Sequence, residues 1–252
     1  MQIRKGIDVA GLSDVGCQRQ NNEDHYSYWE PANDAEFERK GRLAIVADGM
    51  GGHEGGQEAS HIAVEAIQEV YAAMSGGDAQ SALAAGFHEA HQRISRHALQ
   101  HPELRGMGTT ATAVVVLAKH LYYAHIGDSR LYLLRGGETA RVTHDHSYVS
   151  RLVENGTITD EEGEVHPQRH VLTAALGVGF DVSPDAPENP VDLKSGDALV
   201  LCSDGLWGML SEAEIREGVT NRGAEEACRA LVALAKKRGG PDNITVLLLR
   251  VL

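Results

Sequence analysis

The chain has 252 residues, enough for one large domain or two small ones with a sizeable hydrophobic core. Its 23 basic and 36 acidic residues give a formal net charge of −13, which argues against sequence-independent binding to nucleic acid or to an anionic membrane. An anionic substrate would therefore need a local positive centre. The three cysteines, Cys17, Cys202 and Cys228, have no paired spacing and favour a reducing compartment over a disulfide framework or a zinc ribbon.

The amino-acid sequence shows no targeting signal and no boundary between domains. No segment has the apolar length of a signal peptide or of a membrane span, so we expect a cytoplasmic protein. No linker, repeat or low-complexity tract is present, which predicts a single domain over residues 1–252. No oligomerisation signature is visible, and the expected state is a monomer.

Two long helices are predicted in the first half of the chain. Apolar residues recur at helical spacing from Gln57 to Met74, and again after Asp78 from Leu83 to Ala98. The short turn SGGD between them predicts antiparallel neighbours. Four histidines on or just past the second helix have a spacing that predicts a solvated face rather than a metal site: His88, His91, His97 and His101.

The hydrophobic period then changes from that of helices to that of strands. Residues 109–143 are rich in β-branched and aromatic side chains and are interrupted at Lys119-His120 and Gly136-Gly137, which predicts an antiparallel meander of hairpins. A short helix closed by Asn155-Gly156 follows. The polar stretch from Thr157 to Arg169 predicts an irregular, mobile excursion that is well placed to act as a flap.

The last part of the chain predicts a strand in DALVLC, a helix from Ala224 to Lys237, and a final strand in NITVLLLRVL. The helix places Cys228 on its apolar face, which indicates a core position. Because strands and helices do not alternate regularly along the chain, the order of elements favours sheets with helices layered outside them.

Four aspartates stand at the ends of predicted strands. The strings LAIVADGMGG and LVLCSDGLWG both end in Asp-Gly, at Asp48 and Asp204, while Asp128 follows a third strand and Asp242 precedes the last one. A lone Asp-Gly commonly makes a turn. Four convergent carboxylates repel one another unless their pKa values rise or a cation lies between them. Oxygen ligands without a cysteine or histidine set indicate Mg²⁺ or Mn²⁺ rather than zinc.

The hexapeptide RQNNED, residues 19–24, supplies the positive centre. If it is extended, it places Arg19, Asn21 and Glu23 on one face and Asp24 on the other. The planar fork of a guanidinium fits a phosphate group. A surface strand with an ion pair is the alternative interpretation.

Seven strings together resemble one known family. RQNNED, ADGMGGHEGG, MGTTAT, HIGDSR, DHS, CSDGL and GPDNITVLLL occur in the order and approximate spacing of the metal-dependent PP2C (PPM) protein phosphatases, and the chain resembles a bacterial member from about Gly6 to Leu249. The resemblance implies an α+β fold, a four-layer αββα sandwich of two antiparallel sheets flanked by helix pairs, with a flap at about 145–170. It also implies hydrolysis of phosphoserine and phosphothreonine in proteins by a hydroxide that bridges two metal ions.

The same resemblance implies a ligand set for two Mn²⁺ or Mg²⁺ ions and a possible third. Asp48 would bridge two ions, with the Gly49 carbonyl on one of them and with Asp204 and Asp242 on the other. Asp128 matches the residue that supports a third, looser ion in bacterial relatives.

Further roles are implied for residues beside this set. Glu23 and Asp24 would act largely through metal-bound waters, and Arg19 would hold the phosphate. His53 stands further beyond the aspartate than the histidine of eukaryotic relatives. A role of His53 in proton transfer or substrate positioning and a plain loop position near the metals both stay open, and a metal-bound water is the rival acid.

Three other features bear on the site or depart from the family pattern. The GTT stretch that begins at Gly108 predicts packing and hydrogen bonding under the site. The loop 27–42 is longer than the minimal version, and we expect its aromatic residues to pack locally. His170 stands where bacterial relatives more often have asparagine, which leaves the contacts of the flap open.

These features predict a Mn²⁺- or Mg²⁺-dependent serine/threonine phosphatase that acts on phosphorylated proteins and opposes bacterial protein kinases. A pseudophosphatase that binds phosphoproteins without hydrolysing them is the alternative from another class, and it predicts lost ligands, whereas every expected carboxylate is retained. A phosphatase specialised for a phosphorylated anti-sigma-factor antagonist is a third reading.

Overall fold

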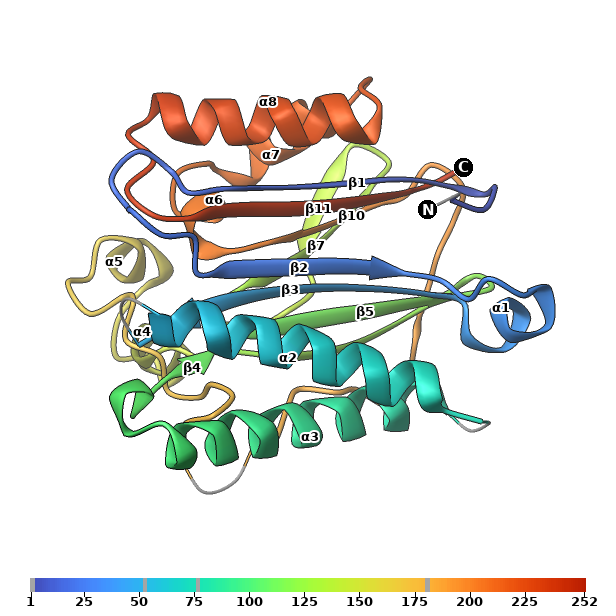
Figure 1. Ribbon diagram of the computed structural model, residues 1–252. Coiled ribbons are helices and arrows are strands. Elements are labelled where there is room, and N and C mark those ends of the chain that lie inside the picture. The colour runs from blue at the N-terminus through green and yellow to red at the C-terminus, as the bar shows by residue number, and fades with distance from the viewer. Residues whose placement is uncertain (1–2, 52–53, 76–77, 180–181) are drawn as a thin grey trace.

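Two antiparallel sheets pack against each other, and helices cover both outer faces (Figure 1). The computed structural model describes residues 3–51, 54–75, 78–179 and 182–252. The first sheet has the order β1-β11-β10-β7-β8, formed by Ile7–Asp14, Ile244–Val251, Ala198–Cys202, Arg130–Arg135 and Glu138–Arg141. The second has the order β2-β3-β5-β6-β9, formed by Asp24–Trp29, Arg42–Met50, Ala111–Leu117, His120–Ile126 and Val191–Asp192, and β4 (Gly108–Thr109) pairs with β3.

The outer layers are two pairs of helices. Helices α2 (Glu54–Ala73) and α3 (Ala79–Gln100) lie side by side over the second sheet, and α7 (Glu212–Val219) and α8 (Ala224–Lys237) cover the first (Figure 1). The remaining helices are shorter: α1 (Asp34–Lys40), α4 (Tyr148–Glu154), α5 (Asp160–Glu164), α6 (Asp204–Trp207) and the 3₁₀ helix η1 (Pro102–Leu104). The predicted αββα sandwich is confirmed. None of the described helices is long and apolar enough to cross a bilayer.

The strand pattern explains why the layers form. Along β3, Leu43, Ile45 and Ala47 pack towards the helices, whereas Ala44 and Val46 pack between the two sheets. Both faces of this strand are apolar because each is covered, and successive side chains of a strand point to opposite faces. A third cluster lies between the first sheet and α8 and contains Cys228, as its place in the helix predicts.

The predicted single meander is wrong, because the chain changes sheets in the middle of it. Strands β5 and β6 pair in the second sheet, and β7 and β8 pair in the first. The crossing occurs at residues 127–129, between β6 and β7. Gly127 has a φ of +101°, and a Cβ there would lie 2.5 Å from the Cβ of Thr110, so the crossing needs a glycine. The residue composition of a segment predicts that it forms a strand, but it does not predict which sheet that strand joins.

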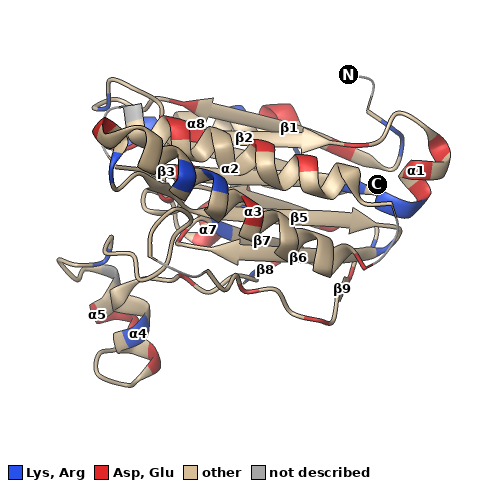
Figure 2. Cartoon of the chain, turned by 60° about the horizontal axis from the view of Figure 1, so that its bottom comes forward, with Lys and Arg blue, Asp and Glu red and all other residues tan. Residues whose placement is uncertain are grey.

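The flap segment, residues 145–170, contains more regular structure than predicted. Helix α4 begins after Ser147, whose hydroxyl accepts a hydrogen bond from the Ser150 N–H, and this helix was expected. The stretch 157–169 is not wholly irregular, because Thr159 and Glu162 form a capping box that starts α5. In Figure 2, α4 and α5 project from the body of the protein.

Two expectations about side-chain exposure have different outcomes. The solvated helix face is wrong for His91, which is 7% exposed and accepts a hydrogen bond from the Gly177 N–H. Residues 27–42 are not a single loop, because they include the end of β2 and helix α1, and their aromatic side chains pack within the protein both locally and against the core. Phe37, for example, lies between the guanidinium groups of Arg4 and Arg42, at 4.8 and 4.7 Å from its ring centroid.

Candidate active site

One pocket of about 1160 Å³ lies where strand ends of both sheets meet. It brings together most of the residues predicted from the sequence: Arg19, Glu23, Asp48, Gly49, Asp128, Asp204 and Asp242. Asp24 does not line the pocket and lies beside it, opposite Asp48 in the β2–β3 pairing. His53 lies outside the described residues.

Hydrogen bonds with Thr109 and Thr110 fix both the N–H and the carbonyl of the Asp48 backbone. Its N–H donates to the Thr110 hydroxyl at 3.0 Å, and its carbonyl accepts from the Thr110 N–H at 2.9 Å and from the Thr109 hydroxyl at 2.9 Å. The Thr110 hydroxyl also contacts the Ser129 hydroxyl at 2.7 Å. The GTT stretch therefore makes hydrogen bonds under the site, as predicted, and it fixes the strand end that carries the carboxylate.

Two glycines allow β3, α2 and Glu23 to approach closely. A Cβ on Gly49 would lie 2.0 Å from the Gly56 carbonyl oxygen, and a Cβ on Gly56 would lie 1.9 Å from the Glu23 Oε2 atom. Any side chain at either position would displace the glutamate or the strand end. The glycines after Asp48 thus serve a packing need beyond turn formation.

Asp24 connects the two sheets. Its side chain is buried, and its Oδ2 atom accepts a hydrogen bond from the Ser203 hydroxyl at 2.7 Å. Ser203 in turn accepts from the Thr245 N–H at 3.0 Å. The Asp24 Oδ1 atom is buried without a hydrogen-bond partner. Burial raises the pKa of Asp24 to about 7, and the carboxylate of Asp204 acts in the same direction.

The prediction of an extended RQNNED segment is wrong for residues 19–23. The chain bends at Gln20 and Asn21, and strand β2 begins only at Asp24. The guanidinium of Arg19 nevertheless reaches the pocket, where its Nη2 atom donates to Asp242 Oδ2 at 2.8 Å. Its side chain is 51% exposed, so it stays accessible to an anion.

Asn243 explains this bend and was not singled out by the sequence analysis. Its amide nitrogen donates to the carbonyls of Val15 and Asn21, and its Oδ1 atom accepts from the Glu23 N–H at 2.8 Å. One side chain therefore folds the segment back onto the start of β11. Its place directly after Asp242 in the string GPDN was the only available signal.

Mutual repulsion among the carboxylates makes the pocket a candidate cation site. Burial, and then the charges of Asp24 and Asp204, raise the pKa of Asp48 well above its usual range. Burial and the charge of Asp204 do the same to the pKa of Asp128. Among the described residues, Arg19 pairs with Asp242 and the His170 ring lies against Asp204, and these two groups do not balance so many carboxylates.

The donor chemistry fits a hard divalent cation. The orphaned Asp24 oxygen, the raised pKa values and the exclusively oxygen-bearing donors all favour Mg²⁺ or Mn²⁺. Among the described residues, no three His, Cys, Asp or Glu side chains already stand in an arrangement that holds a metal ion. Side-chain rotation, backbone carbonyls and water would therefore complete the coordination, as is usual for Mg²⁺.

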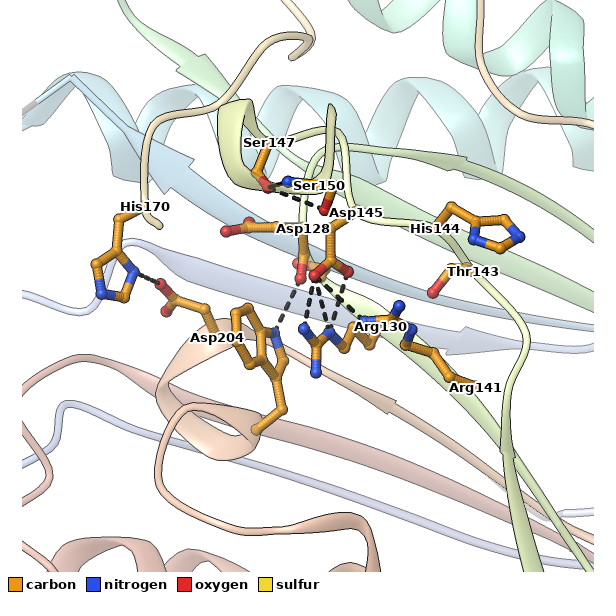
Figure 3. A network of polar contacts seen from close by, with 12 residues as sticks. Asp128, Arg130, Arg141, Thr143, His144, Asp145, Ser147, Ser150, His170 and Asp204 are labelled. Atoms are coloured by element: carbon orange, nitrogen blue, oxygen red, sulfur yellow. Dashed lines mark hydrogen bonds and ion pairs between the residues drawn. The ribbon is translucent and has the colours of Figure 1, made fainter. Parts of the chain in front are cut away.

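The flap reaches the pocket through His170. Its Nδ1 atom lies 3.5 Å from Asp204 Oδ2 (Figure 3), so the histidine that departs from the family pattern contacts a candidate ligand. Arg169 also lines the pocket. The end of the flap thus contributes basic groups to the rim of an otherwise acidic site.

A pocket lined by several carboxylates and by the guanidinium groups of Arg19 and Arg169, at one end of an αββα sandwich, fits the class of metal-dependent phosphatases. The chain belongs to the protein phosphatase 2C family, whose pattern matches residues 18–245. The serine/threonine protein phosphatase PstP of Mycobacterium tuberculosis is 39% identical over 240 residues, which cover 95% of this chain and 44% of PstP. This chain therefore spans less than half the length of that relative.

One further relative and one solved structure match over nearly the whole length of both chains. The protein phosphatase PhpP of Streptococcus pneumoniae is 38% identical over 248 residues, which cover 96% of each protein. A crystal structure of the catalytic domain of PstP in complex with two manganese ions is 36% identical, with a TM-score of 0.84 and coverage of 98% of both chains. The family resemblance predicted from the sequence is confirmed.

Proposed function

We propose that the protein hydrolyses phosphoserine and phosphothreonine in phosphorylated proteins with the help of divalent cations. The observation that carries this proposal is the convergence of Asp48, Asp204 and Asp242 with the guanidinium of Arg19 in one pocket. The names of the relatives, serine/threonine protein phosphatase and protein phosphatase, support the same reaction class.

The proposed cations are Mn²⁺ or Mg²⁺, two at the main site and a third beside Asp128. Asp48, the Gly49 carbonyl, Asp204 and Asp242 would hold the first two, and Glu23 and Asp24 would act largely through water. Such cations supply Lewis acidity, which activates water as a nucleophile at neutral pH and offsets the charge of the phosphoryl group. The two manganese ions of the PstP catalytic domain support this number.

The chain's own residues orient the substrate. Arg19 projects a planar fork of N–H donors into the pocket, which suits two phosphate oxygens, and Asp242 holds that fork in place at 2.8 Å. The hydrogen bonds of Thr109 and Thr110 to Asp48 keep the acidic strand end at a fixed position below it. The proton for the departing serine or threonine oxygen would come from His53 or from water.

The proposed setting is bacterial phosphorylation signalling. We expect the protein to oppose one or more serine/threonine kinases, to act as a monomer in the cytoplasm, and to use residues 1–252 as a single phosphatase domain. The three cysteines are free, which agrees with a reducing compartment. The net charge of −13 opposes binding to nucleic acid or to anionic membranes.

The decisive experiment measures phosphate release from a phosphothreonine peptide with Mn²⁺ and with EDTA. Asp242→Asn is the test variant, and Asp192→Asn is the matched control, because its side chain is 82% exposed and lies outside the pocket. We expect release that needs the cation, disappears in Asp242→Asn and persists in Asp192→Asn. Release that survives EDTA or Asp242→Asn would refute the proposed site.

Two other readings give distinct results in the same assay. Folded protein that binds the phosphopeptide in saturating Mn²⁺ without releasing phosphate would be a pseudophosphatase. Rapid release from a phosphorylated anti-sigma-factor antagonist, with none from a kinase activation-loop peptide, would identify the specialised phosphatase. Either result would replace the proposal of a kinase-opposing enzyme.

A further inference from the structure

An aromatic stack joins three segments that are far apart in the chain. Trp207 is the last residue of α6, the helix that begins with Asp204. Its indole N–H donates to the backbone carbonyl of Asp128 at 2.9 Å. The guanidinium of Arg130 lies over the Trp207 ring, with its Cζ atom 3.5 Å from the ring centroid. The helix of one candidate ligand is therefore linked to the backbone of another.

A buried ion pair holds the guanidinium of this stack in place. Arg130 Nε donates to Asp145 Oδ1 at 3.0 Å, and its Nη2 donates to Asp145 Oδ2 at 2.6 Å (Figure 3). The side chain of Asp145 is 7% exposed, and Arg141 lies 3.6 Å from the same Oδ2 atom. A bidentate pair with this little exposure permits one orientation of the guanidinium plane.

Asp145 is the first residue of the flap, and the next residue, His146, also connects the flap to the segment that carries Asp128. The His146 N–H donates to the Gly127 carbonyl at 2.7 Å, and the Gly127 N–H donates to His146 Nδ1 at 3.2 Å. Gly127 directly precedes Asp128. The beginning of the flap is thereby attached to the sheet crossing that carries Asp128, while His170, at the other end of the flap, contacts Asp204.

We propose that Trp207, Arg130 and Asp145 form a clamp of positioning residues that holds Asp128 at a fixed place relative to Asp204 and ties both to the start of the flap. The reason is electrostatic. Asp128 is buried, and the side chain of Asp204 is 17% exposed. Two such carboxylates repel each other and separate unless the backbone that carries them is restrained, and a separation of a fraction of an ångström changes the affinity for a cation beside them. The clamp rests on the proposed function, because it would set the position of the third cation, beside Asp128, relative to Asp204 at the main site.

The test uses Trp207→Phe, which keeps an aromatic face under Arg130 but loses the N–H donor to Asp128. Calorimetric titration with Mn²⁺ should show about fivefold weaker affinity for the loosest cation, the loss expected from one net hydrogen bond. Trp29→Phe is the matched control. Trp29 packs on Tyr71 with ring centroids 6.3 Å apart and lies at the opposite end of β2 from Asp24. The Trp29→Phe variant should therefore have the same Mn²⁺ affinities as the parent protein.

A pair of variants tests whether the clamp acts as a unit. Arg130→Lys loses both the bidentate geometry and the planar stack, and Asp145→Asn loses the charge that holds the guanidinium. Each should weaken the loosest Mn²⁺ site about as much as Trp207→Phe does. When either is combined with Trp207→Phe, the loss of Mn²⁺ binding free energy should be smaller than the sum of the two single-variant losses. Additive effects would overturn the clamp.

Other outcomes separate a clamp from a merely structural stack. Trp207→Phe with Mn²⁺ affinities within twofold of the Trp29→Phe control would overturn the proposal, whatever happens to its Tm. In Trp29→Phe, Trp207 is the sole tryptophan, and its fluorescence should change as Mn²⁺ saturates the site; unchanged emission would also count against the clamp. Failure of the proposed function is distinguishable, because the parent protein itself would then release no phosphate.

Discussion

The pocket floor and the flap hold their side chains in different ways. The pocket floor consists of the segments that carry Asp48, Asp204 and Asp242, with Asp24 beside it, and its backbone is hydrogen-bonded between neighbouring strands or to buried hydroxyls. The flap, residues 145–170, consists of two short helices with exposed apolar side chains, including Val165 at 77%. On the proposed function, the reaction geometry would depend on the hydrogen-bonded floor, and the exposed side chains of the flap would contact the substrate.

The strongest test of the pocket floor is Asp48→Asn. The amide keeps the shape of the side chain but removes the charge, so kcat/KM for a phosphothreonine peptide should fall roughly a hundred- to thousandfold. Because the pKa of Asp48 is raised in the fold, the neutral amide should also raise Tm in EDTA. Phosphate release and thermal unfolding check both statements. Activity within tenfold of the parent would remove Asp48 from the site.

A second test asks how closely the floor is packed. The Cβ of Gly56→Ala would lie 1.9 Å from Glu23 Oε2, so the glutamate or α2 must move. We expect a loss of about 1–3 kcal/mol in the free energy of unfolding and roughly a hundredfold loss of activity from the misplaced groups. Gly55→Ala is the control, since among the described residues its Cβ would meet the Met107 Cβ at 3.3 Å and the Met107 Cα at 4.0 Å. Equal behaviour of the two variants would contradict the close approach.

The pH dependence of the free energy of unfolding tests whether the buried carboxylates of this region destabilise the fold when no cation is bound. Burial raises the pKa of Asp24 to about 7, whereas the unfolded carboxyl titrates near 4. The folded protein therefore binds more protons than the unfolded chain between these values, and the free energy of unfolding falls as pH rises. In EDTA, Tm should be lower at about pH 7.5 than at about pH 5.5, and saturating Mn²⁺ should reduce this difference.

Two variants locate that effect. Asp24→Asn should reduce the dependence in EDTA, because the amide does not titrate and can still accept from Ser203, whereas the raised pKa values of Asp48 and Asp128 keep part of it. Asp14→Asn should leave it in place, because the pKa of Asp14 is lowered, against the effect of burial, by the hydrogen bond from Lys236. A parent protein that becomes more stable from about pH 5.5 to 7.5 in EDTA would show that the carboxylates are not strained by burial.

The smallest expected effect concerns the flap. Arg169 lines both the main pocket and an adjoining groove between the flap and α6, so Arg169→Ala should lower kcat/KM for a phosphopeptide about threefold, the size of one exposed charge contact. Hydrolysis of p-nitrophenyl phosphate and Tm should not change. Arg151→Ala, an exposed residue of α4 outside both pockets, is the control. An equal loss on the small substrate would place Arg169 in the chemistry rather than in substrate selection.

The departures from prediction share one physical cause. Local patterns identified α3, α4 and α8, because periodicity and caps such as Asp78 act within a few residues. They failed where a distant group decides the conformation. Asn243 bends residues 19–23, and contact with the Gly177 N–H accompanies the burial of His91. The Arg130–Trp207 stack was equally invisible, because its members are separated by most of the second half of the chain.

The sequence by itself determined the family, the layered α+β class and the candidate carboxylates, because a shared order of short motifs and the hydrophobic periods are written into the chain. Tertiary structure alone decided which side chains meet. The chain crosses from one sheet to the other at Gly127, and Asp24 lies between the sheets with its Oδ1 atom lacking a hydrogen-bond partner. Trp207 links the helix that begins with Asp204 to the backbone of Asp128. These outcomes depend on packing between segments that are remote in sequence, and such contacts leave no local pattern.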